Sequence, residues 1–170
     1  MGTAKELRDA ILTFQKSGKF VLAYNSGEYI SQKAYYISSV ADEVYAFPKS
    51  VFEWKGLGGE VQFFKGLLDK LDVDVQIIRG SDNDFKSAVE PFYRKSMSDS
   101  SRMQTERYLS SMWSMYLSDI EKTTQINKDT LDAYAEILRI RGASDAHDLG
   151  LIDGLKYRDE IENILMKKTK

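Results

Sequence analysis

One lysine, Lys86, stands in a segment whose neighbours would allow it to do chemistry. An apolar run from Val73 to Ile78 precedes it, and a polar turn containing Gly80 and Asn83 leads into the lysine. The side chains that flank it are apolar: Phe85, Ala88, Val89 and Phe92. A lysine is usually a solvated surface residue, because its ammonium group is rarely buried without a partner. If apolar side chains enclosed Lys86, the loss of hydration would disfavour the ammonium form and make the amine a general base.

Three carboxylates lie close to Lys86 in the sequence, at Asp82, Asp84 and Glu90. If they faced the amine, they would stabilise its charged form and oppose base chemistry. Asp82 and Asp84 also match the start of a calcium loop, but Lys86 occupies the third alternate position and no glycine follows. We therefore predict a turn without a metal ion, and the local residues leave both interpretations of Lys86 open.

The remaining candidate groups are weaker. A Ser-His-Asp triad would have to use His147, the only histidine, but we expect it to be an exposed helical residue beside two carboxylates. With no cysteine, the chain excludes thiol catalysis and disulfides, and it disfavours zinc. Residues 56–59 are glycine-rich, yet Val61 stands where a dinucleotide loop needs glycine, and no Walker lysine follows. We expect no cofactor, with Gly58 and Gly59 serving close backbone packing or exposing N–H groups at a helix start.

The composition is that of a globular chain long enough to bury a core. The 170 residues are 42% hydrophobic and 29% charged, and 24 Lys and Arg against 26 Asp and Glu give a net charge of −2. This balance offers no basic surface for nucleic acid and no polybasic membrane patch. No apolar run approaches the roughly 18 residues of a membrane span. Because a helical pattern begins almost directly after Met1, we expect the chain to be a fragment of a larger protein.

Apolar periodicity predicts helices alternating with short strands, which indicates βαβ units and a parallel sheet. The expected helices cover residues 4–16, 30–40, 56–71, about 25 residues after the N-cap Ser98, 128–138, 146–149 and 157–166. The expected strands cover residues 20–24, 44–47, 51–54, 73–78 and 151–154. In the first helix, Leu7, Ala10, Ile11 and Phe14 form the apolar face. We expect an α/β fragment of one domain, with a βαβ part at residues 4–92 and a mainly helical part at residues 93–170.

Several segments resemble the signal peptide peptidase A (protease IV) family, which are membrane-bound bacterial serine peptidases with a Ser/Lys dyad. The most specific are FKSAVEPF at residues 85–92 and AHDLGLIDGL at residues 146–155. Less specific matches are YISQKAYYI at residues 29–37, ADEVY at residues 41–45 and LLDKL at residues 67–71. The resemblance implies a Clp-protease/crotonase-like fold of repeated βαβ units.

The resemblance also implies that Lys86 is the general base. Catalytic repeats of the family carry the nucleophilic serine where this chain has Gln32, and Lys33 and Ala34 replace two glycines. An amide cannot attack a carbonyl, so this chain would be the first of two tandem repeats, and inactive by itself. The serine would come from a second repeat of the same or a neighbouring subunit in a homo-oligomer. The implied substrates are cleaved signal peptides, met at the extracytoplasmic side of the bacterial inner membrane by an enzyme anchored through another segment.

Other residues and functions remain as alternatives. Ser31 and Ser87 are hydroxyls near the motifs, but neither matches the family's nucleophile, so we expect structural roles; Lys33 ranks far below Lys86 as a base. A non-catalytic crotonase-fold interaction domain would use the helix around Trp113 as an assembly surface. A crotonase-type acyl-CoA enzyme would be expected to carry a catalytic carboxylate and a nucleotide pocket, neither of which the sequence indicates.

Overall fold

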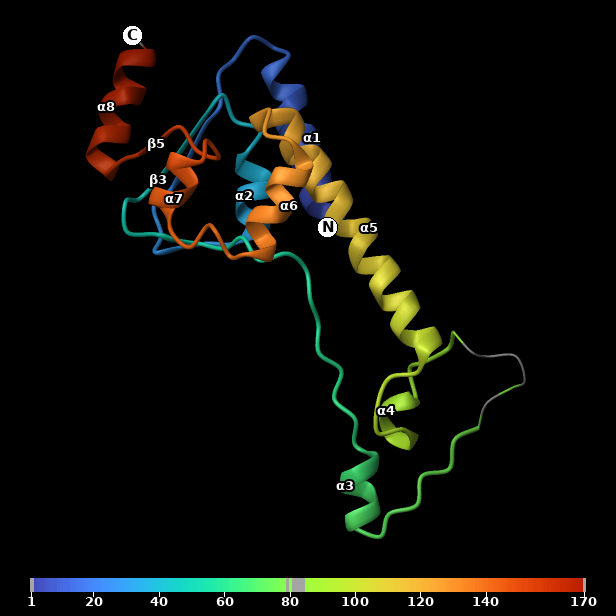
Figure 1. Cartoon of the computed structure of the whole chain (residues 1–170). Coiled ribbons are helices and arrows are strands. Elements are labelled where there is room, and N and C mark those ends of the chain that lie inside the picture. The colour runs from blue at the N-terminus through green and yellow to red at the C-terminus, as the bar shows by residue number, and fades with distance from the viewer. Residues whose placement is uncertain (1, 79, 81–84, 170) are drawn as a thin grey trace. The chain divides into compact units, whose positions relative to one another are not determined.

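The computed structural model describes residues 2–78, 80 and 85–169 (Figure 1). It divides into two compact units, the first comprising Met1–Gly56 with Ser114–Lys170, and the second Leu57–Trp113. The helices are α1 (Gly2–Gln15), α2 (Gln32–Ser38), α3 (Lys65–Lys70), α4 (Glu90–Tyr93), α5 (Asp99–Thr124), α6 (Lys128–Glu136), α7 (Ala143–Asp148) and α8 (Arg158–Lys168). The strands are β1 (Leu22–Asn25), β2 (Tyr29–Ile30), β3 (Glu43–Ala46), β4 (Val51–Phe52) and β5 (Gly154–Leu155).

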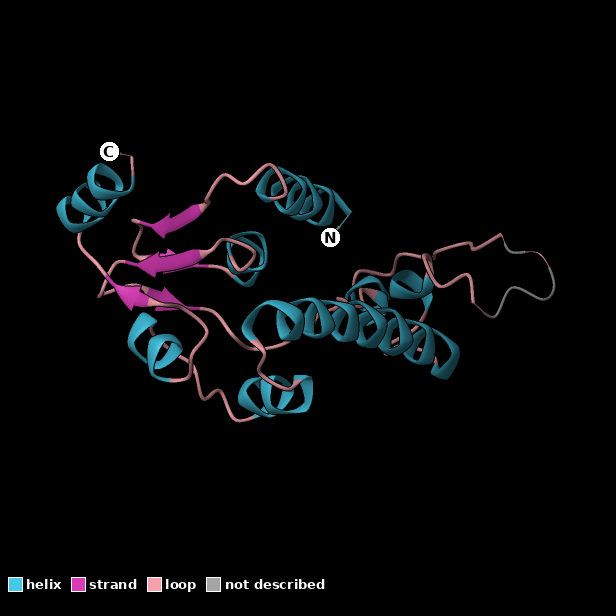
Figure 2. Cartoon of the chain, turned by 90° about the horizontal axis from the view of Figure 1, so that it is seen from above, coloured by secondary structure: helices cyan, strands magenta, loops and turns pink. Residues whose placement is uncertain are grey.

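The first unit contains two small parallel sheets, which confirms the predicted α/β class with parallel strands (Figure 2). One sheet has the strand order β1-β3-β5, and the other pairs β2 with β4. In the larger sheet Ala23 lies opposite Val44, and Tyr45 lies opposite Gly154. A Cβ at Gly154 would lie 3.3 Å from the Tyr45 ring, so a glycine lets this ring lie against the strand. The parallel order follows from α2 carrying the chain back between β1 and β3.

Aromatic side chains from α2, from the segment after β4 and from α5 form the centre of the first unit. The Tyr36 and Tyr116 rings stack with centroids 5.3 Å apart, and the Trp54 ring lies 5.6 Å from Tyr116 and 5.9 Å from Tyr35. All four side chains are buried. The Trp54 Nε1–H donates to the Leu131 carbonyl oxygen at 2.9 Å, which links the segment after β4 to α6 and satisfies the one polar group of the indole.

Helix α1 buries a face other than the predicted one. Its buried side chains are Ala4 and Arg8, whereas Leu7 and Phe14 are exposed, so the expected apolar face was wrong. The Arg8 guanidinium finds acceptors on α2 and α5: Nη1 donates to the Tyr36 carbonyl at 2.5 Å, and Nη2 donates to the Asp119 carbonyl at 2.6 Å. Because these hydrogen bonds replace hydration, a charged side chain can be buried at this helix contact.

In the second unit, α3 and α4 pack together beside the first part of α5. The Phe64 N–H donates to the Pro91 carbonyl at 2.7 Å, and the rings of Phe64 and Phe92 stack with centroids 6.0 Å apart. The Ser98 hydroxyl accepts the Ser101 N–H at 3.2 Å, which confirms Ser98 as the N-cap of α5. These contacts gather α3, the lysine motif and the start of α5 into one cluster.

Two predicted elements of the second unit differ from the structure. Residues 73–78 form no strand, because no described strand pairs with them, and Ile78 is 92% exposed. The helix expected over residues 56–71 is confined to α3 (Lys65–Lys70). Gly58 and Gly59 disfavour helix at the beginning of the predicted range, although α3 itself contains Gly66. Nothing lies within 4 Å of a Cβ at either glycine, so the predicted close backbone packing was also wrong.

Candidate functional site

Lys86 lies in irregular backbone just before the helix α4 (Glu90–Tyr93), and its side chain is exposed. Two of its predicted apolar neighbours are also largely in solvent, with Phe85 54% and Phe92 44% exposed. Within this chain, therefore, the described residues place no apolar enclosure over the amine. Asp82 and Asp84, the carboxylates of the partial calcium loop that precede Lys86, lie outside the described residues.

The backbone immediately after Lys86 is nevertheless held by specific contacts. The Glu90 N–H donates to the Ser87 carbonyl at 2.9 Å, which closes a turn directly behind the lysine. The Glu90 side chain is buried, and its carboxylate accepts hydrogen bonds from Ser98. Glu90 was predicted only as a nearby negative charge. The only sequence signals for its structural role are its place in the lysine motif and the N-cap serine eight residues later.

Gln32 occupies the position that the resemblance assigns to a serine, and both ends of its amide are hydrogen-bonded in the first unit. Its Oε1 accepts the backbone N–H groups of Lys55 at 2.6 Å and Gly56 at 3.1 Å, and its Nε2 donates to the Gly56 carbonyl at 3.0 Å. Gly56 has φ of +77°, a left-handed conformation that glycine adopts without strain. Such a pair of consecutive N–H groups is the type that binds an oxyanion in acyl-transfer enzymes, and here a neutral amide oxygen fills it.

The backbone of Gln32 is held as firmly as its side chain. The Gln32 N–H donates to Glu53 Oε2 at 3.2 Å, and its carbonyl accepts the Tyr116 hydroxyl at 2.9 Å. A hydrogen bond from the Lys55 ammonium, 2.7 Å away, is the main cause of a lowered pKa of the Glu53 carboxyl. Gln32 is thus a packed structural residue without a nucleophilic atom, and its contacts could not be predicted from local sequence because its partners lie 21 or more residues away.

The other hydroxyl and amine candidates lie at structural or exposed positions. Ser31 caps α2, with its Oγ accepting the Ala34 N–H at 3.1 Å, as expected for a structural serine. The Ser87 carbonyl accepts the Glu90 N–H in the turn after Lys86, and the Ser87 side chain is half-buried. Lys33 is exposed on α2.

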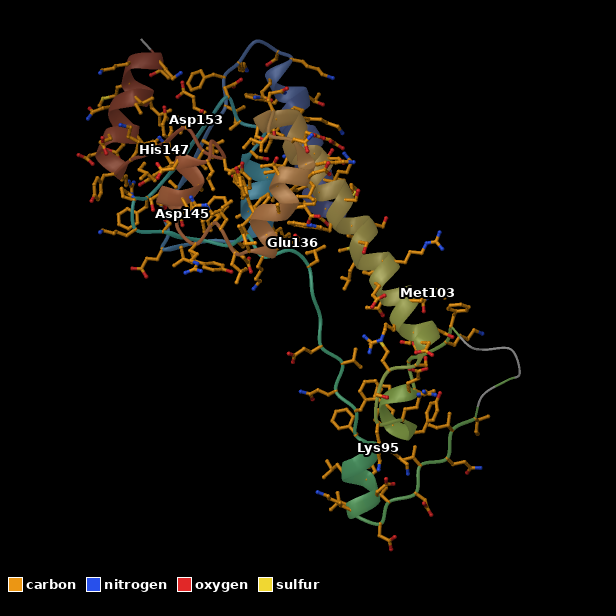
Figure 3. The ribbon with its side chains drawn as sticks, in the orientation of Figure 1. Lys95, Met103, Glu136, Asp145, His147 and Asp153 are labelled. Atoms are coloured by element: carbon orange, nitrogen blue, oxygen red, sulfur yellow. The ribbon has the colours of Figure 1, made fainter. Side chains whose placement is uncertain are left out.

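His147 is an exposed residue of α7, as predicted. Its Nδ1 lies 3.4 Å from Asp148 Oδ1, a long contact between neighbours in the sequence. Asp145, labelled with His147 in Figure 3, is used at the start of the same helix, where its Oδ2 accepts the N–H groups of Arg141 and Gly142. A catalytic triad would need a carboxylate that orients the histidine toward a serine, and the described residues around His147 do not form one.

Further findings on the described residues concern metal-binding clusters, membrane-spanning helices and cavities. No group of three or more metal-binding side chains occurs among them, and none of their helices combines the length and hydropathy needed to span a bilayer. A cavity of about 360 Å³ lies in the first unit between α1, β1 and α2. Its lining is mainly apolar and includes Ile11, Ala34 and Ile37, but none of the candidate residues. The cavity therefore adds no catalytic group.

The comparisons with known proteins point to one family. The model of Peptidase family S49 matches residues 13–170. Protease 4 of Haemophilus influenzae is 34% identical over 163 residues, covering 92% of this chain and 26% of that protein. Protease 4 of Salmonella typhi is 32% identical over 94% of this chain and 26% of its own length.

A plant relative extends the likeness beyond bacteria. The chloroplastic serine protease SPPA of Arabidopsis thaliana is 27% identical over 98% of this chain and 24% of its own length. The chain thus spans about a quarter of the length of the curated relatives it matches. Because the family model covers nearly the whole sequence, the chain belongs to Peptidase family S49, whose members have a ClpP/crotonase-like fold and include signal peptide peptidase A, also called protease IV.

Proposed function

We propose that this chain is the base-bearing part of a serine endopeptidase, with Lys86 as the general base for a serine supplied by another domain. The observation that carries the proposal is the packed amide of Gln32 at the position where a catalytic repeat would hold its serine. Lys86 lies in the lysine motif on an exposed segment, accessible to a second domain. The peptidase family, the relative named Protease 4 and the plant relative named as a serine protease support the same chemistry.

The reaction is acyl transfer to the serine and then to water. The seryl oxygen attacks the peptide carbonyl while the neutral Lys86 amine takes the hydroxyl proton. The resulting ammonium gives a proton to the departing amine as the C–N bond breaks and the acyl-enzyme forms. A water molecule then attacks the ester, and the amine accepts and returns the proton in the same way. Because Lys86 is exposed in this chain, the apolar walls that keep its amine neutral come from the partner domain.

The surrounding assembly follows from the same proposal. The chain is the first of two tandem repeats, and the serine belongs to the second repeat of the same or a neighbouring subunit of a homo-oligomer. Its substrates are signal peptides already cleaved from their proteins, degraded at the extracytoplasmic side of the bacterial inner membrane. A segment outside this sequence anchors the enzyme. The coverage of about a quarter of each relative supports a role as one part of a larger enzyme.

A second candidate function is a non-catalytic interaction domain with a crotonase fold. The exposed apolar side chains of the second unit favour it, because a protein interface would bury such side chains. They include Leu67, Leu71, Val73, Ile78 and Met103; Met103 is labelled on α5 in Figure 3. This function predicts a contribution to assembly, and Lys86 would then be dispensable for turnover.

The substitution Lys86→Ala in the assembled peptidase separates the two functions. A general base contributes about 10²- to 10⁴-fold, so we expect kcat to fall by that factor while KM for a peptide substrate changes little. The matched control is Lys95→Ala, which removes an exposed lysine of the same unit whose ammonium lies 3.9 Å from Asp69. Turnover at the wild-type rate by the Lys86→Ala enzyme would discard the base assignment and favour the interaction domain.

A serine-directed fluorophosphonate tests the division of the dyad. The 170-residue chain should not be labelled, whereas the assembled enzyme should be labelled on the serine-bearing domain. Peptide mapping identifies the modified residue. A label on Ser31 or Ser87 of this chain would contradict the proposal that the nucleophile comes from elsewhere.

A further inference from the structure

A buried carboxylate, Glu90, lies close in the sequence to the proposed base. Glu90 is only 3% exposed although it lies four residues after Lys86 in an otherwise solvent-exposed segment. Burying an ionised carboxylate costs free energy unless hydrogen bonds replace its hydration. The contacts that compensate this cost therefore indicate what the residue does.

The Glu90 carboxylate accepts two hydrogen bonds from Ser98, the residue that caps α5. Oε1 accepts the Ser98 hydroxyl at 2.5 Å, and Oε2 accepts the Ser98 N–H at 3.1 Å. The same hydroxyl accepts the Ser101 N–H, and the Ser98 carbonyl accepts the Arg102 N–H at 2.9 Å. A negative charge beside the N-terminus of this 26-residue helix is also favoured by the helix dipole.

The backbone of Glu90 is linked to the lysine on one side and to α3 on the other. Its N–H closes the turn with the Ser87 carbonyl, directly after Lys86. The next residue, Pro91, accepts the Phe64 N–H, and the Phe92 ring stacks on the Phe64 ring. The turn behind Lys86 is thus attached to α5 through the Glu90 side chain and to α3 through the following two residues.

We propose that Glu90 is a positioning residue that holds Lys86 in register for the serine of the second domain by anchoring the lysine turn to the N-cap of α5. It touches neither the substrate nor the reacting atoms, and it acts through the backbone of residues 87–90. This inference rests on the proposed function, because it presumes that Lys86 is the base. A displacement of about 1 Å of a catalytic group can lower a rate by about 10²-fold.

The test compares Glu90→Gln, Ser98→Ala and Ser98→Thr in the assembled peptidase. Gln keeps the shape of the side chain but presents an N–H₂ group to one of the two donors of Ser98, so one bond is lost. We expect Glu90→Gln and Ser98→Ala to lower kcat about 10- to 100-fold with KM within about twofold of the wild-type value. Ser98→Thr keeps the hydroxyl and should retain most of the turnover.

Two further variants complete the design. The matched control is Glu106→Gln, which removes an exposed carboxylate from α5, the helix that Ser98 caps, and should leave kcat unchanged. Glu90→Gln and Ser98→Ala break the same contact. The kcat of the double variant should therefore be about that of the less active single variant, and the two fold-losses should not multiply. Thermal unfolding and oligomeric state are measured for every variant.

Each outcome decides the inference. Folded Glu90→Gln and Ser98→Ala enzymes with wild-type kcat would overturn it, as would equal kcat for Ser98→Ala and Ser98→Thr. If Glu90→Gln does not fold, the comparison of Ala with Thr at position 98 gives the answer. Lys86→Ala is assayed in parallel: an active Lys86→Ala enzyme refutes the proposed function, whereas an inactive one beside an active Glu90→Gln enzyme refutes this inference only.

Discussion

Replacing the buried arginine of α1, Arg8→Met, should strongly destabilise the first unit. Arg8 is 3% exposed, and its guanidinium makes short hydrogen bonds to the Tyr36 carbonyl, the Ser39 hydroxyl and the Asp119 carbonyl at 2.5 to 2.6 Å. It also lies over the Tyr36 ring, 4.8 Å from the centroid. Methionine preserves the length and packing of the stem but leaves these acceptors without their donor.

The expected loss can be worked from these contacts. Hydrogen bonds that involve a charged group contribute about 1.5–3 kcal/mol each, so three contribute about 4.5–9 kcal/mol. Burial of the guanidinium, which is the main cause of a lowered pKa of Arg8, costs several kcal/mol that the methionine variant recovers. The net loss should be about 2–4 kcal/mol, a large part of the 5–15 kcal/mol that stabilises a typical domain.

Urea unfolding of the 170-residue chain, followed by circular dichroism and tryptophan fluorescence, measures this loss. Trp54 is buried in the first unit and reports on the core that Arg8 supports. The control is Arg158→Met on α8, where an exposed pair with Glu162 should contribute less than about 0.5 kcal/mol. If Arg8→Met shifted the free energy of unfolding by less than about 0.5 kcal/mol at an unchanged m-value, the reasoning about this network would be refuted.

Two further predictions concern acid stability and backbone conformation. A hydrogen bond from the Val21 N–H, 2.7 Å long, is the main cause of a lowered pKa of Asp42. The associated stability is present above the unfolded pKa of about 3.9 and is lost as the pH falls through the lower folded value. Urea midpoints from pH 7 to pH 2 should therefore fall less steeply for Asp42→Asn than for the wild type, and an equal slope would contradict this. Gly150, which follows α7, has φ of +77°. Gly150→Ala should therefore lower the free energy of unfolding by about 1–2 kcal/mol in the same urea assay. The control Gly2→Ala, at an open position with negative φ, should leave the free energy of unfolding unchanged.

Local sequence was sufficient for the parts of the fold that depend on near neighbours. The alternation of short apolar strands with helices predicted the parallel βαβ order. The observed bounds of β1, β3 and α2 each lie within about two residues of the expected ones. Ser98 was recognised as an N-cap because capping is a contact between a side chain and the N–H three residues on. The lysine motif and the replacement of serine by Gln32 were likewise visible in the residues themselves.

Contacts between distant residues were not predictable in this way. Periodicity shows which side chains share a face of α1, but it does not show which face is covered, so it predicted burial of the Leu7 face, whereas the structure buries Ala4 and Arg8. The acceptors that make Arg8 burial favourable lie 28 to 111 residues away. The run at residues 73–78 has the composition of a strand, yet strand formation also requires a neighbouring strand, and the described chain provides none.

The sequence by itself determined the family motifs, the order of elements and the absence of a nucleophile at Gln32. Only the tertiary structure decided that the Gln32 amide oxygen accepts two consecutive backbone N–H groups, and that the Glu90 carboxylate accepts hydrogen bonds from the N-cap residue of α5. The physical reason is the same in both cases. A buried polar group must find its hydrogen-bond partners, and folding, which brings remote segments together, determines which partners are within reach.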